Sequence, residues 1–271
     1  MKILHVVPYF YPAWGYGGPP KAVYEIAKNQ VLLGHDVHVL TTTAFERDEL
    51  LPSGRVNIDG IKVTRLPNIS NFVMWKFHFC TPVGVKDFLR NHEFDCVHLH
   101  EVRTLLNYFS LQNAKTREFV ISPWGTLPYN DSRIFIKRFF DKVLLKNLET
   151  KILVSFAQTD HETEVIKRFA VSKQVVLIPL GIDFREFSHL PSQLEARKQL
   201  GLDINSFYFL FLGRFSPHKG LRNVLLAFNK VRLTFPRARL LLVGRDDGYL
   251  KQVLKLIKLN DLSSMFRSGY I

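Results

Sequence analysis

The amino-acid sequence predicts an α/β fold built on parallel sheets, on three grounds. Short β-branched runs alternate with amphipathic segments along the chain, which is typical of doubly wound proteins. The 271 residues are 46% hydrophobic and 23% charged, which suffices for the core of one large or two ordinary domains. The longest apolar runs, such as residues 207–212, are far shorter than the roughly 20 residues of a membrane-spanning helix.

The elements expected at the start of the chain complete one doubly wound domain, residues 1–178. Pro20 suits the first turn of a helix that Gly34 ends, and Asp59-Gly60 is typical of a hairpin turn. Strands are expected at residues 3–7, 36–41, 95–100, 119–122, 152–157 and 175–179, with paired short strands within 55–66. Helices are expected at residues 20–33, from Thr81-Pro82 onward, at 133–151 and at 161–169.

The alternation breaks at residues 180–191, which we interpret as a hinge before a second domain, residues 179–271. Its expected strands are residues 207–212, 239–243 and 265–269, and its helices are 193–200, 221–235 and 249–259. A domain this short has too few layers to cover both faces of a parallel sheet, so we expect it to be incomplete.

Composition bears on the compartment and the partners. The net charge of +13 and the pI near 9.8 attract polyanions, namely nucleic acid, anionic lipid headgroups or phosphorylated ligands. The sequence lacks zinc-finger spacing and single-strand-binding aromatic patterns, so we expect no nucleic-acid partner. Cys80 and Cys96 are too few for a disulfide framework, and residues 1–7 read as a strand rather than a signal peptide. We expect a cytoplasmic protein, with the inner face of the cell membrane as a candidate peripheral location.

The first candidate binding loop contains Gly17 and Gly18, between the first strand and the first helix. Ligands of open α/β sheets bind beyond the carboxyl ends of strands, and glycine lets them approach the backbone. A turn that needs only positive φ explains these residues equally well. A Gly-x-Gly-x-x-Gly pattern and an acidic residue ending the second strand are both missing, which argues against a dinucleotide-binding enzyme.

The second candidate loop spans residues 213–220, between an expected buried strand and a helix. Arg214 offers a fork of donors, Lys219 a point charge, and the helix N-terminus further N–H groups, a combination that suits a diphosphate. The spacing differs from that of a Walker P-loop. Two basic residues in a loop are commonly a solvated surface, but this placement favours an anion site.

Seven segments together resemble glycosyltransferase family 4. In the family's order they are Gly17-Gly18, "GHDVHVLT" from Gly34, "FDCVHLHE" from Phe94, "SPWGTLP" from Ser122, "VVLIPLGIDFREF" from Val175, "FLFLGRFSPHKGL" from Phe209 and "LLLVGRDDGY" from Leu240. Each segment is weak alone, but the ordered set covers essentially the whole chain and is specific.

The resemblance implies a GT-B fold, in which two Rossmann-like domains face each other across a cleft. It implies transfer of a sugar from a nucleotide-diphosphate sugar to an acceptor hydroxyl, with retention and without a metal or other cofactor. Arg214 and Lys219 then correspond to the residues that hold the donor diphosphate, and Gly17 and Gly18 to the loop beneath the reacting sugar. The acceptor implied is a glycan or lipid-linked, in cell-surface glycan or glycolipid synthesis.

The chain departs from the family's pattern at three places. Trp124 stands where many relatives have a histidine near the transferred sugar, and tryptophan cannot share a proton in that way. Leu180 replaces a usual asparagine. The family's paired glutamates would lie beyond residue 271, so the alternative function is a non-catalytic remnant or half of a split glycosyltransferase. Glu93 and Glu101 have that pair's spacing, which we interpret as coincidence, and the catalytic residue stays unassigned.

His100, near the carboxyl end of the strand at 95–100, is a candidate cleft residue together with Trp124 and Gly125. A strand-end histidine satisfied by a hydrogen bond explains His100 equally well. Its neighbours give no convincing metal cluster, so we expect no metal.

The helix expected at residues 133–151 is amphipathic and basic. Its apolar face consists of Ile136, Phe139, Phe140, Val143, Leu144 and Leu148, and its cations are Arg133, Lys137, Arg138, Lys142 and Lys146. Such a helix can lie on an anionic membrane surface. A helix that packs this face on the sheet and leaves its lysines in water is the favoured alternative.

Overall fold

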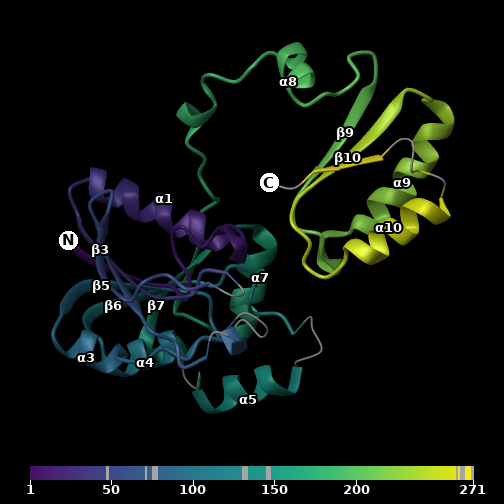
Figure 1. Cartoon of the computed structure of the whole chain (residues 1–271). Coiled ribbons are helices and arrows are strands. Elements are labelled where there is room, and N and C mark those ends of the chain that lie inside the picture. The colour runs from purple at the N-terminus through teal and green to yellow at the C-terminus, as the bar shows by residue number, and fades with distance from the viewer. Residues whose placement is uncertain are drawn as a thin grey trace. The chain divides into compact units, whose positions relative to one another are not determined.

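The computed structural model describes residues 1–46, 49–70, 72–74, 79–129, 134–144, 148–260, 262 and 266–269. The chain forms two compact units, Met1–Ile182 and Asp183–Ile271, which Figure 1 shows. Their boundary lies inside residues 180–191, where the alternation of strands and helices breaks in the sequence.

The first unit is built on an eight-stranded sheet of order β3-β4-β2-β1-β5-β6-β7-β8. Its strands are β1 (Lys2–Val6), β2 (Asp36–Thr42), β3 (Gly54–Ile58), β4 (Ile61–Leu66), β5 (Glu93–His100), β6 (Lys115–Ser122), β7 (Ile152–Ala157) and β8 (Gln174–Leu177). All neighbours pair in parallel except β3 and β4, the antiparallel hairpin that Asp59-Gly60 predicts. The carboxyl ends of the parallel strands share one edge of the sheet, so the loops after β1, β5 and β6 are neighbours there.

Helices cover both faces of this sheet. They are α1 (Gly18–Leu32), α3 (Val85–Arg90), α4 (Leu105–Asn113), α5 (Ile134–Leu144), α6 (Leu148–Lys151) and α7 (Asp160–Phe169). Figure 1 shows α1 on one face and α3 and α4 on the other. Side chains alternate along each strand, so Leu4 and Leu99 pack under α3 and α4, whereas Val39 packs with Val23 and Ala27 of α1.

Two expectations for the first unit are wrong in detail. The helix expected from Thr81-Pro82 begins only at Val85, because Gly84 has a φ of 89° and a left-handed residue cannot continue a helix. Leu33, expected on the buried face of the first helix, is 75% exposed because α1 ends one residue earlier.

The basic amphipathic segment forms α5 and α6, and its apolar side chains divide between core and surface. Phe140 is buried and meets Phe79 edge-on, whereas Phe139 is 68% exposed and Phe135 is 83% exposed. The expectation that Phe139 shares the buried face is therefore wrong. Outside the described residues lie Arg133 and Lys146, and the side chains of Ile136, Val143, Leu144 and Leu148. Across the described ranges, no helix combines the length and the apolar character that crossing a membrane requires.

The second unit has a parallel sheet of order β11-β10-β9. Its elements are β9 (Phe207–Leu212), β10 (Ala238–Val243), β11 (Phe266–Gly269), α8 (Gln193–Gln199), α9 (Leu221–Thr234) and α10 (Leu250–Leu259). Figure 1 shows α9 and α10 on the same side of the sheet, where Leu225, Phe228 and Val253 pack on Leu240.

The strand β9, expected to be buried, exposes Phe207, Leu210 and Leu212 by 62%, 61% and 65%. Leu210 and Leu212 alternate with Phe211, which packs on the helix side, so they lie on the opposite face of the sheet, whereas Phe207 shares the helix side and is exposed on the edge strand. Met265, expected in the last strand, lies outside the described residues.

Candidate functional site

The loop after β1 places Gly17 and Gly18 beyond the carboxyl end of that strand, the edge where open α/β sheets generally bind ligands. A short 3-10 turn, Trp14–Tyr16, precedes it, and the Gly17 N–H donates to the Trp14 carbonyl at 3.0 Å. Gly17 has a φ of 105° and caps α1. A Cβ atom added to Gly18 would meet nothing within 4 Å. The loop therefore leaves open space beside Gly18, which a ligand can enter.

The same helix end offers fewer backbone donors than an ordinary N-terminus. Pro19 and Pro20 occupy its first turn and carry no N–H. An anion at this helix end can accept hydrogen bonds only from the N–H groups of Gly18 and of residues after Pro20. The helix end is therefore a weaker phosphate-binding site than the sequence pattern suggests.

The loop after β6 holds two consecutive residues in the left-handed region. Trp124 has a φ of 55° and Gly125 a φ of 69°. A non-glycine residue there costs about 1–3 kcal/mol and persists only where its surroundings fix it. The Gly125 N–H donates to Glu162 of α7 at 2.7 Å, and that buried carboxylate also accepts from Gln158 N–H at 2.8 Å. Glu162 thereby fixes the far side of the loop.

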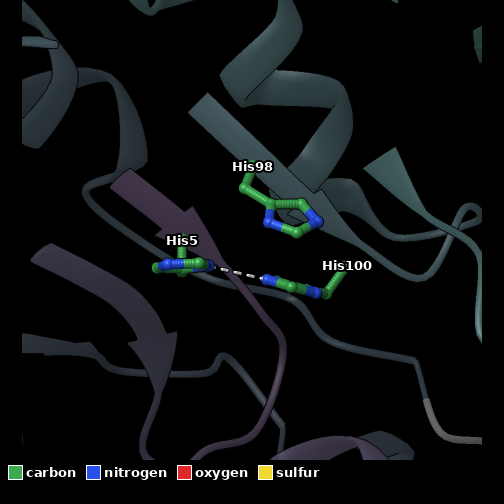
Figure 2. A group of neighbouring side chains, drawn as sticks. All are labelled: His5, His98 and His100. Carbon is green, nitrogen blue, oxygen red and sulfur yellow. Dashed lines mark hydrogen bonds between the residues drawn. The ribbon is translucent and has the colours of Figure 1, made fainter. Parts of the chain in front are cut away.

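Three histidines of β1 and β5 lie side by side, as Figure 2 shows, and His5 contacts Gln30 of α1. His5, His98 and His100 alternate with core residues such as Val97 and Leu99, so all three point away from α3 and α4. All three are buried. The expectation of no convincing metal cluster took account only of the histidines of β5. It did not include His5, because the pairing of β1 with β5 that places His5 beside His98 arises only in the folded chain.

A chain of hydrogen bonds runs from the Trp124 loop through two of these rings to α1. The indole Nε1–H donates to His100 Nδ1 at 3.1 Å, His100 Nε2 is 2.9 Å from His5 Nδ1, and His5 Nε2 is 2.7 Å from Gln30 Oε1. An indole nitrogen can only donate, so His100 Nδ1 must accept. His100 then carries its proton on Nε2, His5 carries its own on Nε2, and every donor in this relay meets an acceptor.

Burial keeps these rings neutral. Desolvation lowers the pKa of His5 to about 4, against a weaker opposing effect of its hydrogen bond to Gln30. Desolvation, with the neighbouring histidines, also holds the pKa values of His98 and His100 well below the ordinary value. Neutral imidazoles are metal ligands, and one nitrogen of each ring lies within 4.8 Å of the others.

The hydrogen bonds make the three histidines a poor metal site. A metal at the centre would need the lone pair of His100 Nε2, which requires a proton on Nδ1 facing the Trp124 N–H. Two donors would then oppose each other. His100 is thus found in the second of its two sequence interpretations, as a buried histidine satisfied by hydrogen bonds, and Trp124 is the half-buried residue that it supports.

Glu101, directly after His100, is a functional candidate that the sequence interpretation set aside. It has a φ of 63°, and Tyr9 donates a 2.5 Å hydrogen bond to its carboxylate. Burial of that carboxyl group raises its pKa to about 7. Tyr9 in turn stacks on Tyr16 at 4.2 Å, immediately before Gly17. The end of β5 therefore supports both loops, Trp124 through His100 and the glycine loop through Glu101.

An ion pair ties α5 to the loop after β6. Arg103 donates to both carboxylate oxygens of Asp141 at 2.7 and 2.8 Å, and to the carbonyls of Thr126 and Leu127. Tyr129 also donates to Asp141 at 2.6 Å. Since the Arg103 side chain is only 9% exposed, this network fixes the position of α5.

In the second unit, Arg214 and Lys219 lie on one loop between β9 and α9. Arg214 pairs with Asp247 at 3.2 Å, and both side chains are partly exposed. Lys219 is exposed at the end of a 3-10 turn, Pro217–Lys219, and Gly220 caps α9 in the left-handed conformation. Phe215 between them is fully buried and anchors the loop. Lys219 thus lies directly before the N-terminus of α9, whereas Arg214, at the start of the same loop, is paired with Asp247.

Comparison with known families gives two matches in chain order. The family described as Glycosyltransferase Family 4 matches residues 16–186, and the family described as Glycosyl transferases group 1 matches residues 192–267. The two matches correspond to the two compact units of the structure.

Curated relatives are mannosyltransferases. The chain is 27% identical to a phosphatidyl-myo-inositol mannosyltransferase of Mycolicibacterium smegmatis, over 91% of this chain and 60% of the relative. It is 22% identical to a GDP-mannose:cellobiosyl-diphosphopolyprenol alpha-mannosyltransferase of Xanthomonas oryzae pv. oryzae, with the same coverage. The chain thus spans about 60% of the length of these relatives.

Solved structures share the fold. Anabaena HepE, in complex with UDP and glucose, superposes with a TM-score of 0.70 at 18% identity, covering 100% of this chain and 69% of that one. WaaG, a glycosyltransferase involved in lipopolysaccharide biosynthesis, superposes with a TM-score of 0.66 at 15% identity, covering 99% and 70%. The predicted fold class, α/β of GT-B type, is confirmed by these likenesses and by the mostly parallel sheets.

Proposed function

The chain belongs to glycosyltransferase family 4, and we propose that it transfers a sugar from a nucleotide-diphosphate sugar to an acceptor hydroxyl. The observation that carries this proposal is the loop at residues 213–220, in the part of the chain that matches Glycosyl transferases group 1. This loop carries Arg214 and Lys219 and leads directly into the N-terminus of α9. These are the groups that bind a diphosphate in water.

In the proposed reaction, the bond between the anomeric carbon and the phosphate oxygen breaks, and its electron pair passes to the diphosphate. The acceptor oxygen forms the new bond to the anomeric carbon and loses its proton. Negative charge grows on the leaving diphosphate, so Arg214 and Lys219 stabilise the transition state more than the bound donor. We propose that this occurs with retention, without a metal or other cofactor, and the anomeric configuration of the product by NMR is the test of retention.

For the first unit we propose that Gly17 and Gly18 form the loop beneath the reacting sugar. The open space beside Gly18 supports this role. Trp124 and Gly125 belong to the neighbouring loop on the same edge of the sheet, and we propose that they face the bound ligands, with His100 behind them.

We further propose a glycan or lipid-linked acceptor, reached at an anionic membrane surface from the cytoplasmic side. Two relatives are named for phosphatidyl-myo-inositol and for a diphosphopolyprenol, both of them lipids. On α5, the exposed Phe135 and Phe139 lie on the same helix as the exposed Arg138 and Lys142. Aromatic residues next to cations are typical of interfacial helices.

Vesicle flotation tests the membrane contact. The chain is expected to float with phosphatidylglycerol vesicles, and replacing Phe135 and Phe139 together by serine should abolish flotation. Flotation with neutral phosphatidylcholine alone, or no flotation, would contradict it.

A transfer assay tests the proposed activity. The full chain is incubated with UDP-glucose or GDP-mannose and a membrane lipid extract, and the release of UDP or GDP is measured. We expect release that depends on the extract and is lost in Arg214→Ala and Lys219→Ala. Release that persists in both variants would overturn the assignment of the donor site.

A further inference from the structure

Three aromatic side chains gather beside the glycine loop. Tyr11 and Trp14 come from the loop after β1, and Tyr24 from α1. The rings of Tyr11 and Trp14 meet edge-on at 5.2 Å, those of Tyr11 and Tyr24 stack at 5.1 Å, and Trp14 lies 6.1 Å from Tyr24. These three residues are called the aromatic cluster below.

Hydrogen bonds anchor the backbone of Tyr11 and Trp14 and the hydroxyl of Tyr24, although the aromatic cluster is at the surface. Arg65 donates to the Tyr11 carbonyl at 3.2 Å, and the Trp14 carbonyl accepts from Gly17 N–H. The Tyr24 hydroxyl donates to Asp59 at 2.5 Å, and this bond raises the pKa of Tyr24 to about 12. Such anchoring reduces the conformational entropy that the loop and the Tyr24 ring lose when a ligand binds.

Packing in the core does not explain why a tryptophan occupies position 14. Its side chain is 40% exposed, whereas Tyr16 two residues later is 5% exposed. An exposed indole that packs with two tyrosines beside the glycine loop offers a surface on which a ligand can stack. The question is which kind of ligand suits it.

The polar groups around the cluster favour a saccharide. A pyranose ring has an apolar face of C–H groups and a rim of hydroxyls, so it can lie on an indole while its rim bonds to carboxylates and phenols. Asp59 and the Tyr24 hydroxyl provide such groups beside the rings. Arg65 and Lys28 also contact the cluster, so charges of both signs surround it, and the hydrogen-bonding rim beside the rings is what favours a saccharide.

From this arrangement we infer that the aromatic cluster, with Asp59, is a binding site for a sugar ring of the acceptor, and that Trp14 is its main contact. This rests on the proposed glycosyltransferase function and specifies the acceptor class as a saccharide that stacks on Trp14. The cluster is linked to the glycine loop through the hydrogen bond from Gly17 to Trp14, so a sugar bound there lies next to the loop proposed to face the donor.

Ligand-observed NMR tests this inference with the full chain. Saturation transfer is measured to cellobiose and to the methyl glycosides of glucose, mannose, galactose and N-acetylglucosamine. At least one saccharide should show transfer strongest at its ring C–H protons. Trp14→Ala should weaken its binding about tenfold, and Trp14→Phe should keep most of it, because a loss of about 1.4 kcal/mol corresponds to a factor of ten.

Controls separate this site from the donor site. Phe235→Ala removes another exposed aromatic, 62% exposed in the second unit, and should leave saccharide binding unchanged. Binding of UDP and GDP should be the same in Trp14→Ala as in the unaltered chain. Absence of any saccharide signal, or a signal that Trp14→Ala leaves intact, would overturn the inference. The inference would also be overturned if phosphatidylglycerol vesicles caused a blue shift of tryptophan fluorescence that Trp14→Ala removes, and no saccharide bound. Failure of nucleotide binding would count against the proposed function alone.

Discussion

The indole N–H of Trp124 donates to Nδ1 of His100 across 3.1 Å, and this single bond sets the direction of the relay behind the loop. It holds His100 in the tautomer with its proton on Nε2, and His5 then also carries its proton on Nε2. A strained loop residue is thereby coupled to the central strands and to α1.

Replacing the donor should release this constraint. In Trp124→Phe the ring remains but the N–H is lost, so His100 Nδ1 no longer has its partner. We expect a loss of about 1 kcal/mol in the free energy of unfolding and a mixture of His100 tautomers in ¹⁵N NMR spectra. Trp14→Phe, at an exposed site, should leave the tautomer unchanged. Finding the Nδ1–H form of His100 in the unaltered chain would contradict the relay.

Gly18→Ala separates ligand binding from folding. The added methyl group meets nothing in the structure and the position has an ordinary helical environment, so stability should be unchanged or slightly higher. If Gly18 lies beneath the reacting sugar, sugar transfer should nevertheless fall at least about tenfold. Gly181→Ala is the matched control, because its added methyl group also meets nothing. Full activity of Gly18→Ala would exclude the proposed role.

Glu101→Gln should stabilise the protein at alkaline pH. The folded-state pKa of about 7 lies above the ordinary value of 4.5 for a glutamate, so the folded state favours the protonated carboxyl, and stability is lost as pH rises from 4.5 through 7. Removing the charge should raise the free energy of unfolding by up to about 3 kcal/mol at pH 8 and by little at pH 4.5, since one pKa unit corresponds to about 1.4 kcal/mol.

Urea denaturation at the two pH values measures this difference. Glu93→Gln, at the exposed first position of β5, should show no such pH dependence. The groups that face Glu101 are Tyr9 and the Cys80 thiol, whose own pKa is raised by burial and by Glu101. An equal effect of Glu101→Gln at both pH values would show that the carboxyl group is not buried in its charged form.

Arg103→Lys should destabilise the first unit although it keeps the charge. Lysine cannot reproduce the fork that binds both oxygens of Asp141 and two carbonyls, so we expect a loss of about 2 kcal/mol in the free energy of unfolding. Arg185→Lys, in an exposed pair with Asp183, should have no measurable effect. Equal stability of both variants would show that the Asp141 network does not fix α5.

The strands and most helices were predictable because local periodicity and turn chemistry specify them. The Asp59-Gly60 hairpin and the helix after Gly220 are examples, since each depends on a few neighbouring residues. The helix at Val85 was misplaced because proline marks a helix start only as a preference, and Gly84 determined the actual cap. The exposure of β9 depends on which helices cover the sheet. The residues of the strand itself do not show this packing.

The candidate site was only partly predictable, for a physical reason. Arg214, Lys219, Gly17 and Gly18 stand out because their residue types and spacing relate directly to phosphate chemistry. His5 and Glu101 do not, because their importance arises from strand register and from a left-handed backbone, which sequence alone does not show. The anchoring of the aromatic cluster likewise depends on Asp59 reaching Tyr24 from another element.

The central claim, a donor diphosphate site on the loop after β9, is tested most directly by calorimetric titration of the chain with UDP and GDP. Loss of one charge-assisted contact should cost roughly 1.5–3 kcal/mol, or about one to two decades in affinity. We predict binding of at least one nucleotide, weakened to this extent in Arg214→Ala and in Lys219→Ala. No binding of either nucleotide, or binding that neither substitution weakens, would contradict the claim.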